Sequence, residues 1–339
     1  MAWIEHHWQH ITPVSVLLYP LSLLYGAVTA ARRAAYRVGM LESARLPVPI
    51  VVVGNLSVGG TGKTPLTLWL AAFLGARGRK PGIVCRGYGG RASAPRPVGA
   101  DSDPLECGDE AVLLAQRSGC AVWAGTDRAA TARALLAAQP GCDVLLSDDG
   151  LQHYALARDA EICVIDAGRG FGNGWLLPAG PLREPPSRLA RVDGVVINGQ
   201  PARAADTLTA RLPAGIPRFN MAIEGSVFRH VRHPEHRVDA GHFRGKRAHA
   251  LAGIGDPRRF FAHLEALGIA FTSHAFPDHH AYTADALSFA GASPVVMTEK
   301  DAVKCVRFAG DDWWALVVDA APDPALGELV LRKLEAQRA

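Results

Sequence analysis

Hydrophobic and polar positions divide the chain into three regions, of which the first is an uncharged run over positions 11–31. The run is mostly apolar, follows Trp8 and is closed by Arg32 and Arg33. About 20 apolar residues suffice to cross a bilayer, but two prolines and a glycine interrupt this run. We therefore favour a helix that lies in one leaflet, held by aromatic and basic flanks, over a membrane span or a helix buried in the protein's own core. A signal peptide is disfavoured, because no basic segment precedes the run.

In the second region, short runs rich in β-branched residues alternate with helix-like segments. Strands are predicted at Ile50–Gly54, Gly82–Cys85, Ala121–Ala124, Val144–Ser147, Glu161–Asp166 and Gly194–Asn198. Helices are predicted at Lys63–Ala76, Asp109–Arg117 and Asp127–Ala138. This α/β alternation is typical of a mostly parallel sheet with helices on both faces. Ligands bind at the carboxyl ends of the strands in such sheets, so polar residues just after the strands are the candidates for chemistry.

A change in composition near Leu212–Pro217 marks the start of the third region. Beyond it, a polar extended stretch at His230–Phe243 precedes a second set of alternating elements. Strands are predicted at His249–Ala252, Ala270–His274, Pro294–Thr298 and Ala315–Asp319, and helices at Pro257–Leu267, Thr283–Ala290 and Pro324–Glu335. We predict an N-terminal membrane-associating helical segment (1–43), a nucleotide-binding domain (44–215) and a smaller C-terminal α/β domain (216–339).

The glycine-rich stretch after the first predicted strand indicates a P-loop NTPase-like fold. Glycines let backbone N–H groups turn around a polyphosphate, and the following helix directs its positive end at the same anion. We expect Lys63 to reach the β- and γ-phosphates of ATP and the Thr64 hydroxyl to enter the shell of a Mg2+ ion. The alternative is a glycine-rich turn without a ligand. The predicted ATP-binding residues are Ser57, Val58, Gly59, Gly60, Thr61, Gly62, Lys63 and Thr64.

Carboxylates at the ends of two elements extend this site. Asp148 and Asp149 follow a buried strand, where a carboxylate meets the need of a phosphate-bound Mg2+, although an Asp-Asp-Gly turn is the plain alternative. Asp109 opens a predicted helix, where it either caps the helix or accepts a proton from a substrate hydroxyl. The predicted metal ligands are Thr64, Glu110, Asp148 and Asp149.

Basic and polar side chains in the loops after the strands are candidates for holding an anionic substrate. Arginine binds phosphate and carboxylate groups through two parallel hydrogen bonds. For Arg91 and Arg183 the alternative is a solvated loop charge. The predicted substrate-binding residues are Arg86, Arg91, Gln152, His153 and Arg183.

Composition adds few constraints. The chain has 339 residues, a net charge of +4 and six cysteines without a C-x-x-C pair. So small a charge, with no basic stripe, gives no indication of nucleic-acid binding. The cysteine spacings do not suit zinc, and the pair His279-His280 lacks a third ligand at a suitable spacing. Free thiols in a reducing cytoplasm are expected.

Several motifs occur in a fixed order along nearly the whole chain: Val53–Pro65, Arg86–Gly90, Gly108–Glu110, Asp148–His153, Phe171–Trp175, Pro178–Glu184, Asp278-His279 and Thr298–Lys304. Together they resemble the tetraacyldisaccharide 4'-kinases, the lipid A 4'-kinases of Gram-negative bacteria. Ser57 fits the family, which does not keep the first P-loop glycine. Ala111 departs from it, because a proline is expected after Gly-Asp-Glu.

The resemblance implies transfer of the ATP γ-phosphoryl group to the 4'-hydroxyl of a tetraacyldisaccharide 1-phosphate, the lipid A precursor. It also implies that Asp109 and His279 act as a dyad with Asp109 as base, at the cytoplasmic face of the inner membrane, to which the protein attaches as a peripheral or monotopic enzyme. Two rivals are a nucleotide-switched membrane assembly or metal-insertion factor, and a lipid-binding scaffold. Rapid, lipid-dependent release of ADP would favour the kinase.

Overall fold

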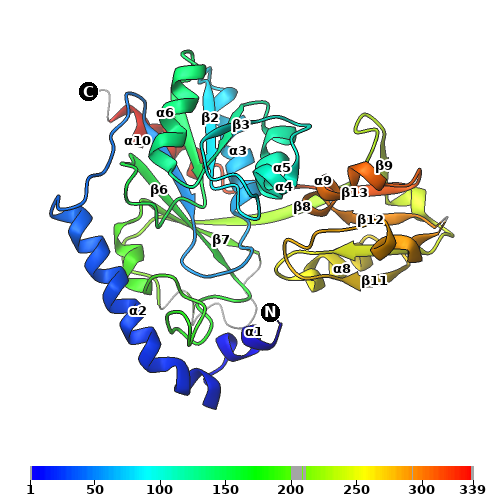
Figure 1. Ribbon diagram of the computed structural model, residues 1–339, viewed down its shortest axis with the longest axis horizontal. Coiled ribbons are helices and arrows are strands. Elements are labelled where there is room, and N and C mark those ends of the chain that lie inside the picture. The colour runs from blue at the N-terminus through cyan, green and yellow to red at the C-terminus, as the bar shows by residue number, and fades with distance from the viewer. Residues whose placement is uncertain (1, 200–207, 209–210, 292, 337–339) are drawn as a thin grey trace.

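A single sheet runs through the protein. The structure, a computed structural model, describes residues 2–199, 208, 211–291 and 293–336. Within them the sheet has 13 strands in the order β11-β10-β12-β13-β8-β7-β6-β1-β5-β2-β4-β3, with β9 paired to β8. Figure 1 shows two lobes on this sheet. We call β1–β7 with α3–α6 the large lobe and β9–β12 with α8 and α9 the small lobe; β8 and β13 run through both.

The elements have the following bounds. The strands are β1 (Ile50–Gly54), β2 (Pro81–Cys85), β3 (Arg96–Val98), β4 (Ala121–Ala124), β5 (Val144–Asp148), β6 (Ala160–Asp166), β7 (Gly194–Asn198), β8 (Arg218–His230), β9 (Arg237–Asp239), β10 (Ala248–Ala252), β11 (Phe271–Ala275), β12 (Val295–Thr298) and β13 (Trp313–Pro322). The helices are α1 (Ala2–Gln9), α2 (Pro13–Arg37), α3 (Lys63–Gly75), α4 (Pro104–Cys107), α5 (Asp109–Ser118), α6 (Arg128–Ala138), α8 (Pro257–Ala266), α9 (Glu299–Cys305) and α10 (Ala325–Glu335).

The large lobe confirms the predicted layers. β1 lies between β5 and β6, and all three strands are parallel. Side chains of successive strand residues point to opposite faces, so the fully buried run of β1 serves two cores. Val51 and Val53 pack in the core that α3, α5 and α10 cover, whereas Ile50 and Val52 pack in the core on the side of α6. Helices on both faces therefore leave the carboxyl edge of the parallel strands free for a ligand.

Two elements of the third region differ from the prediction. β8 was not predicted, although its first half alternates: Phe219 and Met221 are buried between exposed neighbours. The alternation shifts before Phe228, where the pairing with β13 is also irregular. It pairs parallel with β7 at its start and antiparallel with β13 along its length. The helix predicted at Thr283–Ala290 is wrong, since the chain there forms only a short 3-10 helix at Asp285–Ala290.

The last helix returns to the large lobe. Leu326, Val330 and Leu334 of α10 are buried in the same core as Val51. Gly327 lies so close to the ring of Phe73 that a Cβ at this position would clash with it. The division at 43 and 215 stays a prediction, and by its contacts α10 belongs with the nucleotide-binding side.

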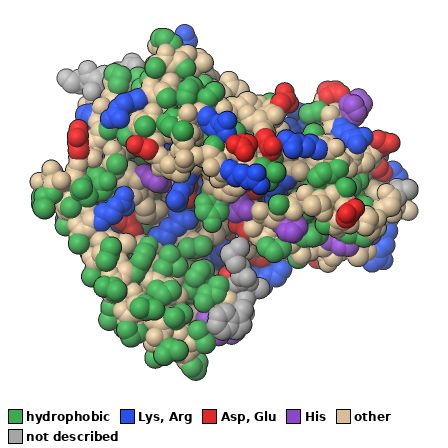
Figure 2. Space-filling model, viewed as in Figure 1, with side chains coloured by type: hydrophobic (Ala, Val, Ile, Leu, Met, Phe, Trp, Pro, Cys, Tyr) green, Lys and Arg blue, Asp and Glu red, His purple; other side chains and the backbone are tan. Residues whose placement is uncertain are grey.

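The N-terminal run forms a continuous helix on the outside of the large lobe. Ser15 and Ser22 are buried, and the Ser22 hydroxyl donates to the carbonyl of Leu176 at 2.7 Å. The opposite face is apolar and open, with Leu17 79% and Leu24 63% exposed. Hydrophobic side chains accordingly gather over α2 in Figure 2. Only 11% of its most apolar window is buried, so the alternative of a core helix is wrong, although α2 is long and apolar enough to cross a membrane.

Candidate active site

The phosphate loop joins β1 to α3. Gly62 precedes the helix with a φ of +92°, and a Cβ there would lie 2.6 Å from Nδ2 of Asn198. Only glycine suits such a position. No side chain caps the first turn of α3, so its N–H groups are open to an anion. The buried hydroxyl of Thr61 has no hydrogen-bond partner among the described residues, so it is available to donate to a phosphate oxygen.

The two aspartates at the end of β5, Asp148 and Asp149, have different surroundings. Asp148 is buried, and its carboxylate accepts hydrogen bonds from Thr64 at 3.2 Å and Thr67 at 2.8 Å. Burial, and then the charge of Glu110, raise the pKa of Asp148 to about 6. Asp149 instead faces Lys63 at 3.6 Å and Arg183 at 3.1 Å. Burial alone would raise the pKa of Asp149, but Lys63 and Arg183 hold it well below its usual range.

These surroundings fit a Mg2+ ion beside Asp148. A buried carboxylate whose ionised form is disfavoured gains from a cation, and the adjacent Thr64 hydroxyl is a hard oxygen ligand. Asp149 is already neutralised by two side chains. Glu110 forms an ion pair of 3.0 Å with Lys300. Among the described residues no group of three His, Cys, Asp or Glu side chains is arranged to hold a metal, so phosphate oxygens and water would have to complete the shell.

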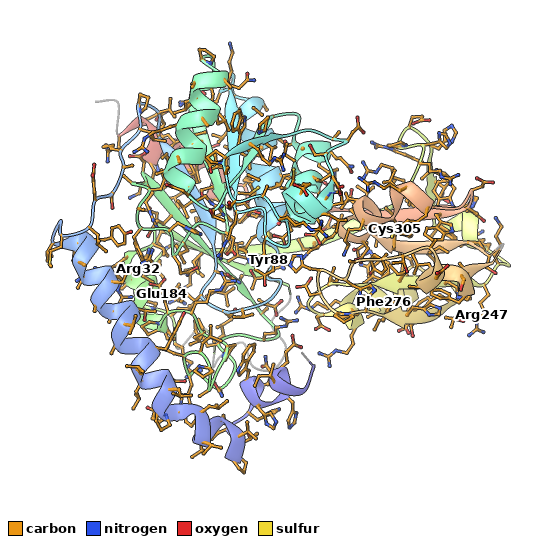
Figure 3. All side chains as sticks on the ribbon, viewed as in Figure 1. Arg32, Tyr88, Glu184, Arg247, Phe276 and Cys305 are labelled. Atoms are coloured by element: carbon orange, nitrogen blue, oxygen red, sulfur yellow. The ribbon has the colours of Figure 1, made fainter. Side chains whose placement is uncertain are left out.

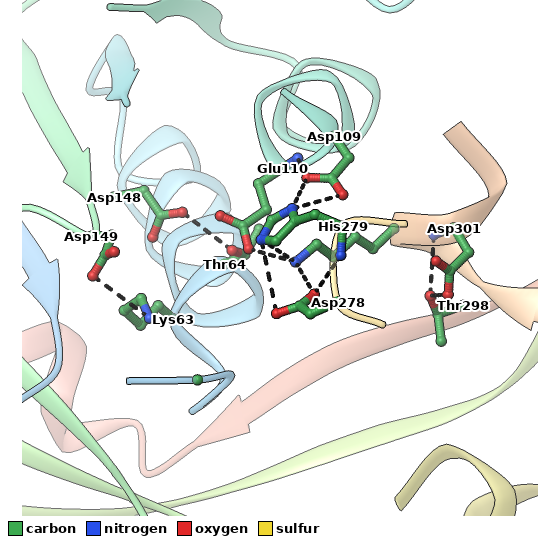
Figure 4. Close-up of polar contacts among 12 residues, drawn as sticks. Lys63, Thr64, Asp109, Glu110, Asp148, Asp149, Asp278, His279, Thr298 and Asp301 are labelled. Atoms are coloured by element: carbon green, nitrogen blue, oxygen red, sulfur yellow. Dashed lines mark hydrogen bonds and ion pairs between the residues drawn. The ribbon is translucent and has the colours of Figure 1, made fainter. Parts of the chain in front are cut away.

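The structure brings Asp109 and His279 together across the two lobes (Figure 4). Nδ1 of His279 lies 3.0 and 3.1 Å from the two carboxylate oxygens of Asp109. Burial would raise the pKa of Asp109, but the hydrogen bond from His279 and the charges of Lys300 and Lys304 lower it. The N-cap alternative is wrong, because Gly108 occupies the cap of α5. His279 has a φ of +58°, an uncommon conformation that often accompanies function.

A cavity of about 350 Å³ opens beside this group. Four of the five predicted substrate-binding residues line it: Arg86, Gln152, His153 and Arg183. Burial, followed by the charges of Arg128 and Arg86, lowers the pKa of His153 to about 4, so His153 is neutral there at pH 7. Arg91 does not line the cavity; its backbone N–H donates to Leu105 at 2.9 Å.

Some site residues were missed by sequence reasoning. Tyr25 and Arg32 of α2 line the cavity, and Arg32 donates to the carbonyl of Gln152 at 3.3 Å. Figure 3 labels Arg32 beside α2, near Glu184 of the large lobe. Arg128 is buried, and it donates to the carbonyl of Asp148 at 2.9 Å. It is the second residue of the helix predicted at Asp127–Ala138, where a charged residue is usually solvated. Lys300 lies in a motif that had been recognised but given no role.

The phosphate loop, the parallel sheet and the aspartate at the strand end define a protein of the P-loop NTPase class. Comparison with known proteins identifies its family within that class. Residues 14–335 match the family described as tetraacyldisaccharide-1-P 4'-kinase. The tetraacyldisaccharide 4'-kinase of Methylobacillus flagellatus is 48% identical over 98% of this chain and 96% of its own length. That of Alkalilimnicola ehrlichii is 52% identical over 95% and 92%.

A solved structure of LpxK from Aquifex aeolicus in complex with ATP is 29% identical, with a TM-score of 0.79 over 95% of this chain and 99% of that one. The chain belongs to the tetraacyldisaccharide-1-P 4'-kinase family. It is therefore an enzyme, an ATP-using kinase of the lipid A pathway, as its motifs had indicated.

Proposed function

We propose that this protein transfers the γ-phosphoryl group of Mg-ATP to the 4'-hydroxyl of tetraacyldisaccharide 1-phosphate, with Asp109 as the general base. The observation that carries the proposal is the position of Asp109, which α5 holds beside the cavity's Glu110 and Ala111 and which His279 contacts from the small lobe. A lowered pKa keeps Asp109 ionised at neutral pH, as a proton acceptor must be.

ATP is assigned to the phosphate loop from Ser57 to Thr64. Lys63 would hold the β- and γ-phosphates there, and its ammonium already lies near the strand-end Asp149. A Mg2+ ion, held by Thr64 and Asp148, would supply charge neutralisation on the transferring phosphoryl group. Asp149 would position Lys63 and Arg183 instead of contacting the metal directly.

The acceptor is assigned to the cavity beside α2. An arginine-rich wall suits a sugar phosphate, since Arg86 and Arg183 can bind phosphate oxygens with paired hydrogen bonds. The open apolar face of α2 would lie in the cytoplasmic leaflet of the inner membrane, and the cavity residues Tyr25 and Arg32 stand on the same helix. The acyl chains can then stay in the bilayer while the disaccharide enters the cavity.

The test follows label from ATP. Full-length protein, γ-labelled ATP and tetraacyldisaccharide 1-phosphate in mixed micelles should give labelled lipid, and Asp109→Ala should lower turnover by roughly 10²- to 10⁴-fold with ATP affinity little changed. If Asp109 and His279 act as a unit, the double variant should be scarcely slower than the slower single one. Fully multiplicative losses would assign them separate roles. ATP hydrolysis that ignores the lipid would support a nucleotide switch instead.

A further inference from the structure

Lys300 stands at the meeting point of the two lobes. It belongs to α9, and its ammonium lies 3.0 Å from Glu110 of α5 and 3.0 Å from Asp278 of the loop that carries His279. It also lies 3.3 Å from Nε2 of His279. Lys300 therefore has acceptors from both lobes, and Figure 4 shows three of the residues it contacts, Glu110, Asp278 and His279, close together.

The chemistry of these groups fixes the direction of the hydrogen bonds. Lysine is an ammonium at neutral pH, and the carboxylates of Glu110 and Asp278, each 3.0 Å from its nitrogen, favour that charged form. An ammonium has three donors and no acceptor. Nε2 of His279 must therefore accept from Lys300, which leaves the ring proton on Nδ1. Nδ1 faces Asp109 at 3.0 Å.

The competing partner of Nε2 is weaker. Asp278 Oδ2 is 3.8 Å from Nε2, beyond hydrogen-bond distance. Oδ1 of the same carboxylate already accepts from Lys300 and from the backbone N–H of His279 at 3.1 Å. Asp278 therefore supports the same protonation of the ring as Lys300 does. Its carboxylate holds the ammonium in place, and the ammonium donates a hydrogen bond to Nε2.

We propose that Lys300 is a positioning residue that locks His279 in the neutral tautomer protonated at Nδ1, so that the imidazole orients Asp109 and does not carry the substrate proton. The inference rests on the proposed function, in which Asp109 is the base. During transfer the O–H bond of the 4'-hydroxyl breaks and its proton goes to Asp109. The oxygen forms a bond to the γ-phosphorus, and the bond from that phosphorus to the leaving ADP oxygen breaks. His279 keeps its Nδ1 proton throughout.

The tautomer can be measured directly. The full chain is prepared in detergent with ring-¹⁵N histidine, and the His279 signals are assigned by their loss in His279→Asn. We expect a pyrrole-like Nδ1 and a pyridine-like Nε2 in the wild type and in Lys300→Arg, which also can only donate. Lys300→Met should lose this pattern, because Nε2 is then free to take a proton. These spectra need no substrate, so they stand apart from any failure of the kinase assay.

Turnover gives the second measurement. Lys300→Met should lower kcat by about 10- to 100-fold, the range for loss of a partner that orients a functional histidine, with KM for ATP unchanged and activity regained in Lys300→Arg. The matched control is Lys246→Met, an exposed lysine of the small lobe 3.9 Å from Asp312, which should keep both tautomer and turnover.

Either of two results overturns the inference: a wild-type His279 protonated at Nε2, or a Lys300→Met protein that keeps the wild-type pattern or the wild-type kcat. If Lys300→Met does not fold, Lys300→Gln replaces it, since an amide can accept as well as donate and so releases the lock. A wild type that labels no lipid would refute the proposed function alone.

Discussion

The two neighbouring aspartates at the end of β5, Asp148 and Asp149, should affect the stability of the metal-free protein in opposite directions. Asp148 has a pKa of about 6 in the folded protein, against about 4 in an unfolded chain. Because the unfolded state loses this proton first, stability falls as pH rises from about 4 to about 6 and stays lost above that range. One pKa unit is worth about 1.4 kcal/mol, so the ionised Asp148 costs about 3 kcal/mol.

Asp148→Asn removes this cost. In EDTA at pH 8 the variant should be more stable than the wild type by about 3 kcal/mol, a rise in Tm of roughly 5 °C for a chain of this size. About half of the gain should disappear at pH 5, where the folded wild type already holds the proton. The same variant should need more Mg2+ for turnover, because the neutral amide is a poorer ligand.

Asp149→Asn is the matched control. Lys63 and Arg183 lower the pKa of Asp149, so its ionised form stabilises the fold at neutral pH and the variant should melt lower, with the loss shrinking only in strong acid. Thermal unfolding of the three proteins in EDTA between pH 5 and pH 8 makes the comparison. A stability change of Asp148→Asn that has no pH dependence, or the same sign for both variants, would refute the argument.

Three further outcomes are expected. Lys63→Ala should abolish label transfer to lipid, because it removes the ammonium that the phosphate loop would offer to the β- and γ-phosphates, and a filter assay with the purified protein checks it. Gly62→Ala should weaken ATP binding about tenfold or more, because its Cβ meets Asn198 at a φ of +92°, whereas Gly75→Ala, which meets nothing within 4 Å, should bind normally in calorimetry. The double variant Leu17→Glu with Leu24→Glu should sediment less with anionic vesicles and keep its ATP affinity. The control Leu105→Glu, at an exposed leucine of α4, should sediment as the wild type does. Unchanged sedimentation of the double variant would exclude the open face of α2 as the membrane contact.

Sequence reasoning was strongest where a local pattern has one physical meaning. The glycines around Lys63 predicted the phosphate loop and the start of a helix, and the apolar run that ends at Asp148 predicted a strand with a carboxylate at its carboxyl end. The structure has both elements. The pairing of Asp109 with His279 came from resemblance, because nothing local relates two residues separated by 170 positions.

Other features depend on packing that no local pattern contains. β8 alternates buried and exposed residues in its first half, but the alternation shifts at the irregularity in its pairing with β13, so no single period covers the strand that joins the two lobes. Arg128 opens a helix in an ordinary way, and only the fold shows that its guanidinium is buried behind Asp148. The helix α2 supplies Tyr25 and Arg32 to the cavity because it lies along the large lobe, a placement its apolar composition does not predict.

The return of α10 to the large lobe has a consequence for synthesis on the ribosome. Domains generally form in order as the chain emerges, beginning with the N-terminal one. Here Leu326 and Val330 complete the core around Val51, yet they emerge only after the whole small lobe. Until α10 has been made, we expect the nascent large lobe to expose the apolar face that α10 later covers. The apolar helix α2 has by then already emerged. A chain stalled before α10 should therefore be a substrate for chaperones and proteases, however complete its phosphate loop is.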